Sequence, residues 1–167
     1  DVLALAVGNG GNVTAYWQGF RSYNRVQKTP RILGVQASGA APLVTGVPVD
    51  QPETIASAIR IGGPATWGPA IAATRDSGGH MRAVTDEEIL EAYRMVAGKE
   101  GIFCEPASAA GVAGLKAAVA DGQLNGQQQC VCVLTGNGLK DPDHAIGPNF
   151  HMLEVQADPV QVARALG

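Results

Sequence analysis

A glycine-rich loop near the start of the chain has the residue types best suited to chemistry. Its members are Gly8, Asn9, Gly10, Gly11 and Asn12. The loop follows an apolar run, Asp1–Val7, that is typical of a buried strand, and it precedes a stretch with helical character. Backbone N–H groups at a helix N-terminus carry partial positive charge, and glycines let the backbone approach a ligand closely. The pattern therefore indicates a site for an anion such as phosphate, with a plain strand-to-helix turn as the alternative.

The spacing within this loop excludes two common phosphate motifs. No Gly-Lys-Ser or Gly-Lys-Thr follows, as a nucleoside triphosphate loop requires. Gly8 and Gly10 fit the start of the dinucleotide pattern G-x-G-x-x-G, but Val13 stands at its third glycine position. The acidic ribose-binding residue is also missing, since the next predicted strand ends at Gln36 and Ala37. If the loop holds a phosphate, we expect one that belongs to neither a nucleoside triphosphate nor NAD.

The composition is that of a globular protein with a large core. Of the 167 residues, 46% are hydrophobic and 16% are charged, and the formal net charge is −3. We therefore expect neither a nucleic-acid surface nor an anionic-membrane surface. No apolar run approaches the roughly 20 residues of a membrane-spanning helix. Cys104, Cys130 and Cys132 lack the spacing of a metal site, and we expect no metal.

Predicted strands and helices alternate along the chain. Strand patterns cover residues 1–7, 31–37, 80–84 and 130–134, and helical patterns cover residues 12–27, 53–60, 67–76, 106–119 and 158–166. A further helix begins after Thr85, which forms a capping box with Glu88. Such alternation favours an α/β fold, with a mostly parallel sheet and helices on both faces.

Two polar, glycine-rich loops follow predicted strands in this arrangement. They are Gly8–Asn12 and Thr135–Gly138, at opposite ends of the sequence. Ligands of open α/β sheets bind at the carboxyl ends of the strands. We therefore expect the two loops to face one crevice.

Blocks of sequence in a fixed order carry a family resemblance. They are VGNGGNVTAYWQGF, RILGVQASGAAPLV, PETIASAIRIGGPATW, DEEILEAY, EGIFCEPASAAGVAGL and VLTGNGLKD. With these blocks the chain resembles the threonine synthases, pyridoxal-phosphate enzymes of the tryptophan-synthase-β-like fold group, from Asp1 to about Asp143. The loop GNGGN and the block EPASAA are typical of the wider group, whereas residues 36–40 and 59–62 favour threonine synthases in particular.

The resemblance implies how the chain divides. Residues 1–148 would form the major part of the large cofactor-binding domain, and residues 149–167 a C-terminal tail and helix. Because the sequence starts inside a strand and without a methionine, we expect it to be the back part of a longer protein. A smaller domain and the start of the large one would lie upstream.

The resemblance also implies a reaction. Threonine synthases convert O-phospho-L-homoserine and water to L-threonine and phosphate by γ-elimination and β-addition, with pyridoxal 5'-phosphate as electron sink. An amino-acid dehydratase or an O-acetylserine sulfhydrylase of the same fold group is the enzymatic alternative. A non-catalytic pyridoxal-phosphate-binding module is an alternative of a different class.

Site residues follow from the match to the family's motifs. The loop Gly8–Asn12 would hold the cofactor phosphate, and Thr135 would hydrogen-bond the pyridine nitrogen, where a neutral hydroxyl moderates the electron sink. Asn9 would also contact the substrate phosphate, unless it stands in the loop because asparagine tolerates positive φ. Glu105 and Ser108 would lie beside the cofactor ring, or Glu105 would be a carboxylate favoured at a helix start.

No catalytic residue is assigned within the chain. None of Lys28, Lys99, Lys116 and Lys140 matches the family's Schiff-base lysine motif, and Lys140 reads as part of a solvated turn. The Schiff-base lysine would lie in an upstream part or on a second chain, so the isolated chain is predicted to be inactive. The family further implies a cytoplasmic homodimer.

Overall fold

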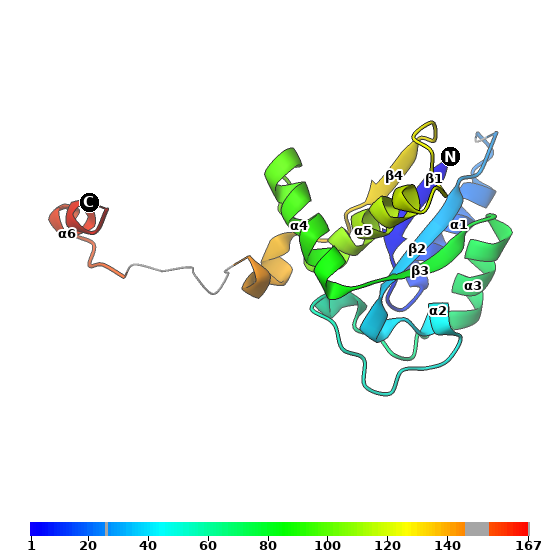
Figure 1. The fold of residues 1–167 in the computed structure, drawn as a ribbon, viewed down its shortest axis with the longest axis horizontal. Coiled ribbons are helices and arrows are strands. Elements are labelled where there is room, and N and C mark those ends of the chain that lie inside the picture. Colours follow the sequence, from blue (N-terminus) through cyan, green and yellow to red (C-terminus); the bar gives the residue numbers. More distant parts are fainter. Residues whose placement is uncertain (26, 146–153, 167) are drawn as a thin grey trace.

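A parallel sheet of four strands forms the centre of the molecule (Figure 1). The computed structural model describes residues 1–25, 27–145 and 154–166. The strands are β1 (Val2–Ala6), β2 (Arg31–Ala37), β3 (His80–Val84) and β4 (Cys130–Val133), in the spatial order β3-β2-β1-β4. Every strand pair is parallel, with Leu3 level with Ile32 on one side and with Val131 on the other. The predicted α/β class is confirmed.

Helices cover both faces of this sheet, as predicted. Helices α1 (Gly11–Ser22) and α3 (Trp67–Asp76) lie on one face, and α4 (Asp86–Glu100) and α5 (Pro106–Ala120) lie on the other (Figure 1). The short helix α2 (Pro42–Thr45) follows β2, and α6 (Pro159–Leu166) ends the chain. Because all the strands are parallel, their carboxyl ends lie at the same edge of the sheet. Each carboxyl end lies next to the start of the segment that follows it.

Alternation along β1 divides the core into two layers. Leu3 and Leu5 pack against the α1 and α3 side, whereas Val2, Ala4 and Ala6 pack against the α4 and α5 side. The whole strand is buried. On the second side α5 lies close to the sheet because Gly114 has no side chain, and a Cβ there would overlap Val35. This close packing fixes the N-terminus of α5 against the carboxyl edge.

Helix α4 begins at the predicted capping box. The Thr85 hydroxyl accepts a hydrogen bond from the Glu88 N–H at 3.2 Å, and the Glu88 carboxylate accepts one from the Thr85 N–H at 2.7 Å. These bonds satisfy two N–H groups at the helix start that have no partner within the helix. The helix then buries Ile89, Tyr93 and Val96 at helical spacing.

Three sequence predictions are wrong in detail. Helix α1 ends at Ser22, not at residue 27, because the residues beyond it are exposed and have no apolar face to bury. Residues 53–60 form only a 3₁₀ turn at Ser57–Ile59, since Thr54 and the Ile55 N–H instead hydrogen-bond the Asp86 carboxylate. Strand β4 is not buried: it lies at the sheet edge, where Val131 is 60% exposed.

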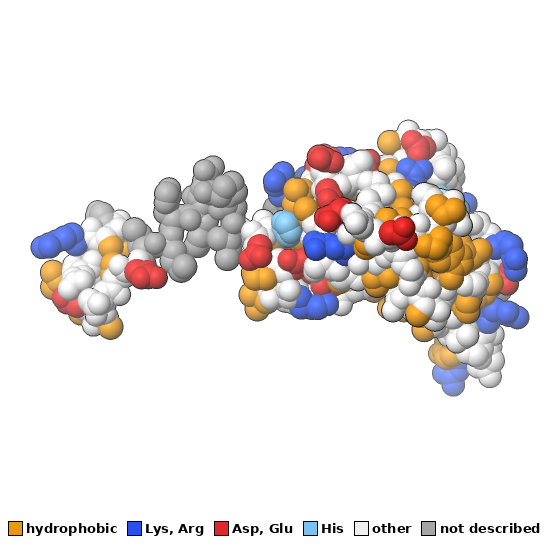
Figure 2. All heavy atoms as spheres, turned by 90° about the horizontal axis from the view of Figure 1, so that it is seen from below, with side chains coloured by type: hydrophobic (Ala, Val, Ile, Leu, Met, Phe, Trp, Pro, Cys, Tyr) orange, Lys and Arg blue, Asp and Glu red, His pale blue; other side chains and the backbone are white. Residues whose placement is uncertain are grey.

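The C-terminal helix α6 lies apart from the layered body in Figure 1, and none of its described residues is buried. The predicted domain boundary at residues 148 and 149 falls outside the described residues. Within the described ranges, no helix combines the length and apolarity needed to cross a bilayer. On the face that Figure 2 shows, basic and acidic side chains are interspersed over the body.

Candidate functional site

A cleft opens at the carboxyl edge of the sheet, between the two glycine-rich loops. Its volume is about 360 Å³. Both predicted loops line it, which confirms that they face one crevice. The lining residues are Ala6, Gly8, Asn9, Gly10, Gly11, Asn12, Ala58, Ile59, Ile61, Glu105, Ala107, Thr135 and Lys140. The cleft thus has a backbone-rich wall, an apolar wall and a wall with a carboxylate, a hydroxyl and an ammonium group.

The backbone-rich wall is the loop Gly8–Asn12. Gly10 has a φ of 82°, in the left-handed region that favours glycine, and this turns the chain into α1. Asn12 holds the turn to the sheet by donating from Nδ2 to the Ala6 carbonyl at 2.7 Å. No side chain caps α1, and among the described residues the Gly11 and Asn12 N–H groups have no acceptor. Both residues line the cleft, so these donors remain available to a ligand there.

The space around the loop's glycines indicates whether the loop fits a bound group. A Cβ built on Gly8 would meet the Ala58 carbonyl at 3.1 Å, and one on Gly10 would meet the Ala70 Cβ at 2.8 Å. Beyond its own helix and its chain neighbours, a Cβ on Gly11 would meet nothing within 4 Å, although this residue lines the cleft. The chain itself gives no steric reason for glycine at this position. A group bound against the backbone gives one, and the loop fits a phosphate.

Asn9 does not stand in the loop because asparagine tolerates positive φ. Its φ is not positive, because among the described residues only glycines have positive φ. Instead its side-chain Oδ1 accepts a hydrogen bond from the Ala65 N–H at 2.8 Å, and its carbonyl accepts one from the Thr66 N–H at 3.1 Å. These bonds fix the loop to the segment before α3. Among the described residues, the Asn9 Nδ2 donor has no acceptor.

The opposite wall is formed by two segments joined across the cleft's base. Cys104 and Asn137 form an isolated antiparallel bridge. The Glu105 N–H donates to the Gly136 carbonyl at 2.9 Å, and the Gly138 N–H donates to the Phe103 carbonyl at 3.1 Å. The bridge brings the start of α5 beside the loop that follows β4. Glu105 and Thr135, thirty residues apart in sequence, consequently become neighbours.

A hydrogen-bonded network of side chains follows from this bridge. The Ser108 hydroxyl lies 3.0 Å from the Thr135 hydroxyl and accepts from the Gly136 N–H at 3.0 Å. The Thr135 hydroxyl donates to Glu105 Oε1 at 3.2 Å, and Lys140 Nζ lies 2.9 Å from Glu105 Oε2. The Glu105 side chain is only 3% exposed, whereas that of Lys140 is 60% exposed. One buried carboxylate thus links a hydroxyl pair to a cation at the cleft's surface.

The loop that carries Thr135 and Lys140 is held by its own polar side chains. Asn137 accepts the Leu139 N–H on Oδ1 at 2.9 Å and so caps a 3₁₀ turn, Gly138–Lys140. The Ser57 hydroxyl donates to Asp141 at 2.8 Å, which ties the turn to the apolar wall formed by Ala58, Ile59 and Ile61. Asn137 therefore has a structural role.

The structure brings the predicted site residues together and adds Lys140, Ile59 and Ile61, which the sequence analysis did not assign to the site. Gly8–Asn12, Glu105 and Thr135 all line the cleft, and Ser108 contacts Thr135 from α5. Lys140 was read as part of a solvated turn, but it lines the cleft and pairs with Glu105. Its place in the block LTGNGLKD, five residues after Thr135, was the available signal. Ile59 and Ile61 were likewise visible only as part of a family block.

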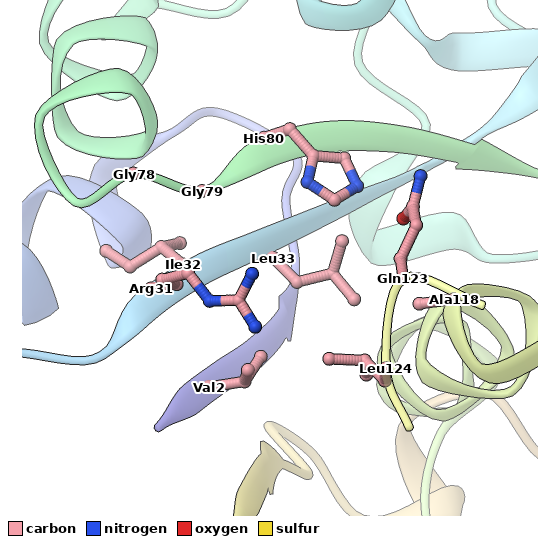
Figure 3. A pocket seen from close by; sticks show the side chains of 10 residues that line it. All are labelled: Val2, Arg31, Ile32, Leu33, Gly78, Gly79, His80, Ala118, Gln123 and Leu124. Carbon is pink, nitrogen blue, oxygen red and sulfur yellow. The ribbon is translucent and has the colours of Figure 1, made fainter. Parts of the chain in front are cut away.

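A second hollow lies at the opposite edge of the sheet (Figure 3). Figure 3 shows the apolar side chains of Leu33 and Leu124 between the polar side chains of Arg31, His80 and Gln123. Burial lowers the pKa of His80, and the positive charges of Arg82 and Arg31 lower it further. The hollow measures about 30 Å³, which suffices for one or two water molecules but not for an organic ligand.

Comparisons with known proteins agree with the cleft's chemistry. The sequence pattern of the family described as "Pyridoxal-phosphate dependent enzyme" matches residues 1–136. The chain is 54% identical over its whole length to the threonine synthase of Mycobacterium tuberculosis H37Rv and 51% identical to that of a Synechocystis species. It spans about half of these relatives, 47% and 44% of their lengths.

A solved structure shows the same fold at low sequence identity. The processed form of threonine deaminase isoform 2 from Solanum lycopersicum superposes with a TM-score of 0.68 at 19% identity. The match covers 86% of this chain and 41% of that one. That likeness shows the fold alone, whereas the family match over residues 1–136 shows that the chain belongs to the pyridoxal-phosphate-dependent enzymes.

Proposed function

We propose that this chain forms the cofactor-binding part of a threonine synthase. The protein would convert O-phospho-L-homoserine and water to L-threonine and phosphate. The observation that carries the proposal is the placement of the Gly8–Asn12 loop and Thr135 on one cleft. It is supported by 54% identity to a threonine synthase across the whole chain.

Each group in the cleft has a distinct task in this proposal. The free N–H groups of Gly11 and Asn12 bind the cofactor phosphate, and the positive end of α1 favours its charge. Thr135 contacts the pyridine nitrogen, and Ile59 and Ile61 keep water from one side of the cleft. Asn9 offers its Nδ2 to the substrate phosphate. Pyridoxal phosphate, when bound, supplies the electron sink for the elimination and the addition.

We propose that the lysine that holds the cofactor lies outside these 167 residues. Lys28 pairs with Asp1, Lys116 pairs with Glu91, and Lys99 lies in the last turn of α4. Lys140 is the lysine that reaches the cleft among the described residues, and its ammonium group is paired with Glu105. Residues 1–148 would then be part of the large domain, completed by an upstream segment or a second chain.

The experiment uses the holoenzyme, meaning the complete polypeptide or complex that carries this chain and pyridoxal phosphate. Borohydride reduction locks any covalent link between cofactor and lysine, and peptide mass spectrometry locates it. We expect the adduct on a lysine outside residues 1–167. An adduct specifically on Lys140 would overturn the placement of that lysine. Lys140→Arg would serve as the matched variant for that peptide.

Product analysis separates the proposal from its alternatives. With O-phospho-L-homoserine we expect equal amounts of phosphate and threonine. An amino-acid dehydratase would instead release a keto acid and ammonia from threonine or serine, and an O-acetylserine sulfhydrylase would release acetate from O-acetylserine. A protein that binds the cofactor but turns over none of these substrates would be a binding module.

We also propose that the enzyme is a cytoplasmic homodimer, as the resemblance to threonine synthases implies. Sedimentation velocity of the holoenzyme tests the dimer, and a fluorescent fusion of the complete protein tests the compartment. A monomeric or membrane-associated holoenzyme would contradict this part of the proposal without affecting the chemistry of the cleft.

A further inference from the structure

Helix α1 has a second apolar face besides the one that it buries. Val13 is fully buried and packs into the core on this side of the sheet. A groove of about 430 Å³, here called the α1 groove, runs along the outside of the helix. Its lining residues are Asn12, Ala15, Tyr16, Gly19, Phe20 and Tyr23. Their spacing of three and four residues is that of one stripe along a helix, and none of them is charged.

Two small residues interrupt the aromatic side chains along the α1 groove. Ala15 and Gly19 lie four residues apart on the stripe. A glycine inside a helix costs stability relative to alanine. Beyond its own helix and its chain neighbours, a Cβ on Gly19 would meet nothing within 4 Å, so the described residues give no steric reason for glycine. A second helix that packs closely against this stripe gives one, because small residues form the groove into which its side chains fit.

The aromatic side chains of the α1 groove are open to solvent in this chain. Tyr16 is 38% exposed and Tyr23 is 57% exposed. Phe20 also lines a neighbouring hollow with Val131, on the exposed edge strand β4. Apolar surface therefore continues from α1 to the edge of the sheet. A contiguous apolar surface of this kind marks a face that packs against another element.

One end of the α1 groove opens at the cleft. Asn12 lines both of them, and its side chain is held in place because Oδ1 accepts a hydrogen bond from the Val13 N–H at 2.7 Å. From Asn12 to Tyr23 the stripe is about 16 Å long, or three helical turns. A helix of that length seated along the groove therefore has one end beside the loop Gly8–Asn12.

We propose that the α1 groove seats a helix of the part of the protein that carries the cofactor lysine, and that this contact positions the lysine at the cleft. The inference rests on the proposed place of that lysine outside residues 1–167. This chain spans 47% and 44% of two threonine synthases, so such relatives have at least as much chain again to supply the helix. The face of the helix that enters the groove is apolar, because the groove presents no charge to pair with.

The size of the α1 groove favours this helix over two other occupants. Each partner of a stable dimer contributes about 20–30 residues, whereas six residues line the groove. A segment joined to this chain needs a smaller contact, because the linkage keeps its local concentration high. The C-terminal helix α6 has eight residues and is about 12 Å long, which is shorter than the stripe.

A pair of glycine substitutions tests whether the α1 groove is occupied in the holoenzyme. Gly98 is the matched control: it lies near the end of α4, is exposed, and its Cβ would likewise meet nothing within 4 Å beyond its own helix and its chain neighbours. Gly98→Ala should raise the urea midpoint of unfolding, because alanine favours the helix. Gly19→Ala should lower it, because the methyl group enters a packed contact. An equal rise in both variants would overturn the proposal.

Photochemical crosslinking of the holoenzyme identifies the occupant. p-Benzoylphenylalanine is placed at position 16, in the groove, or at position 18, where the exposed Gln18 lines no part of it. Borohydride reduction then marks the cofactor lysine, and peptide mass spectrometry locates both links. We expect position 16 to crosslink to the helix next to the marked lysine and position 18 not to do so. A crosslink from position 16 to α6 or to a second copy would overturn the proposal.

The outcomes separate this inference from the proposed function. A marked lysine outside residues 1–167, with position 16 crosslinked elsewhere, would overturn only the inference. A marked lysine within residues 1–167 would overturn the proposed place of the lysine, and the inference with it. Failure to make threonine, with the expected crosslink observed, would overturn only the proposed reaction.

Discussion

Two neighbouring glycines in the loop Gly8–Asn12 should respond in opposite ways to the same substitution. In Gly10→Ala the new Cβ meets the Ala70 Cβ at 2.8 Å and the Thr66 hydroxyl at 2.9 Å, at a φ of 82°. The left-handed conformation costs a non-glycine residue about 1–2 kcal/mol, and overpacking costs about 1–3 kcal/mol. We expect a loss of roughly 2–5 kcal/mol in the free energy of unfolding, out of a typical total of about 5–15 kcal/mol.

Gly11→Ala should leave the fold intact and weaken the cofactor site. Beyond its own helix and its chain neighbours, nothing lies within 4 Å of the added Cβ. Alanine is favoured over glycine in a helix by up to about 1 kcal/mol, so the free energy of unfolding without cofactor should not fall. A methyl group on the cleft side keeps a phosphate from the N–H donors, and a hydrogen bond to a charged group is worth about 1.5–3 kcal/mol. The Kd for pyridoxal phosphate should rise roughly tenfold to a hundredfold.

The two quantities are measured on the same preparations. Urea unfolding of the cofactor-free protein gives the free energies of unfolding, and absorbance titration gives the Kd. The reasoning is refuted if Gly11→Ala binds pyridoxal phosphate as tightly as the wild type does, because the phosphate would then not lie against this residue. Equal destabilisation by both substitutions would refute the steric distinction between them.

Three further predictions concern groups outside the cleft. Burial and the nearby Arg82 lower the pKa of His80 in the folded state. The free energy of unfolding should therefore fall as the pH drops below about 6.5, and it should fall less in His80→Gln. Urea unfolding at several pH values measures both. Burial raises the pKa of the Cys132 thiol to about 11. Iodoacetamide at pH 7.5 should therefore leave this thiol unmodified in the folded holoenzyme, and peptide mass spectrometry would detect any modification. Thr85→Ala breaks the capping box with Glu88 and should lower the free energy of unfolding by about 1 kcal/mol, with Thr85→Ser close to wild type.

Local signals were enough to predict several elements of the fold. Strand β2, strand β3 and helix α3 begin and end where turn residues and apolar periodicity predict. Thr85 and Glu88 carry the capping box in four consecutive residues, so no long-range information is needed. The meeting of Gly8–Asn12 with Thr135–Gly138 followed from the rule that parallel strands end at one edge.

Other features depend on contacts between distant residues that periodicity does not encode. Residues 53–60 look helical alone, but Thr54 and Ile55 bond to Asp86, which is about thirty residues away. The run Cys130–Val133 is apolar enough for a central strand, and only the sheet order places it at an edge. Lys140 looks solvated in sequence because its partner, Glu105, lies on another segment.

The pairing of β1 with β4 bears on how the protein is made. β1 starts at Val2 and lies inside the sheet, yet one of its two neighbours is β4, which starts at Cys130. On the ribosome, chains grow at about 5–20 residues per second, so that side of β1 waits several seconds or more for its partner. Until then its backbone donors and acceptors are an unprotected edge, which invites pairing with other nascent chains. Both walls of the cleft assemble only when β4 arrives, so a chain that stalls before residue 130 carries the loop Gly8–Asn12 without the opposite wall of the cleft.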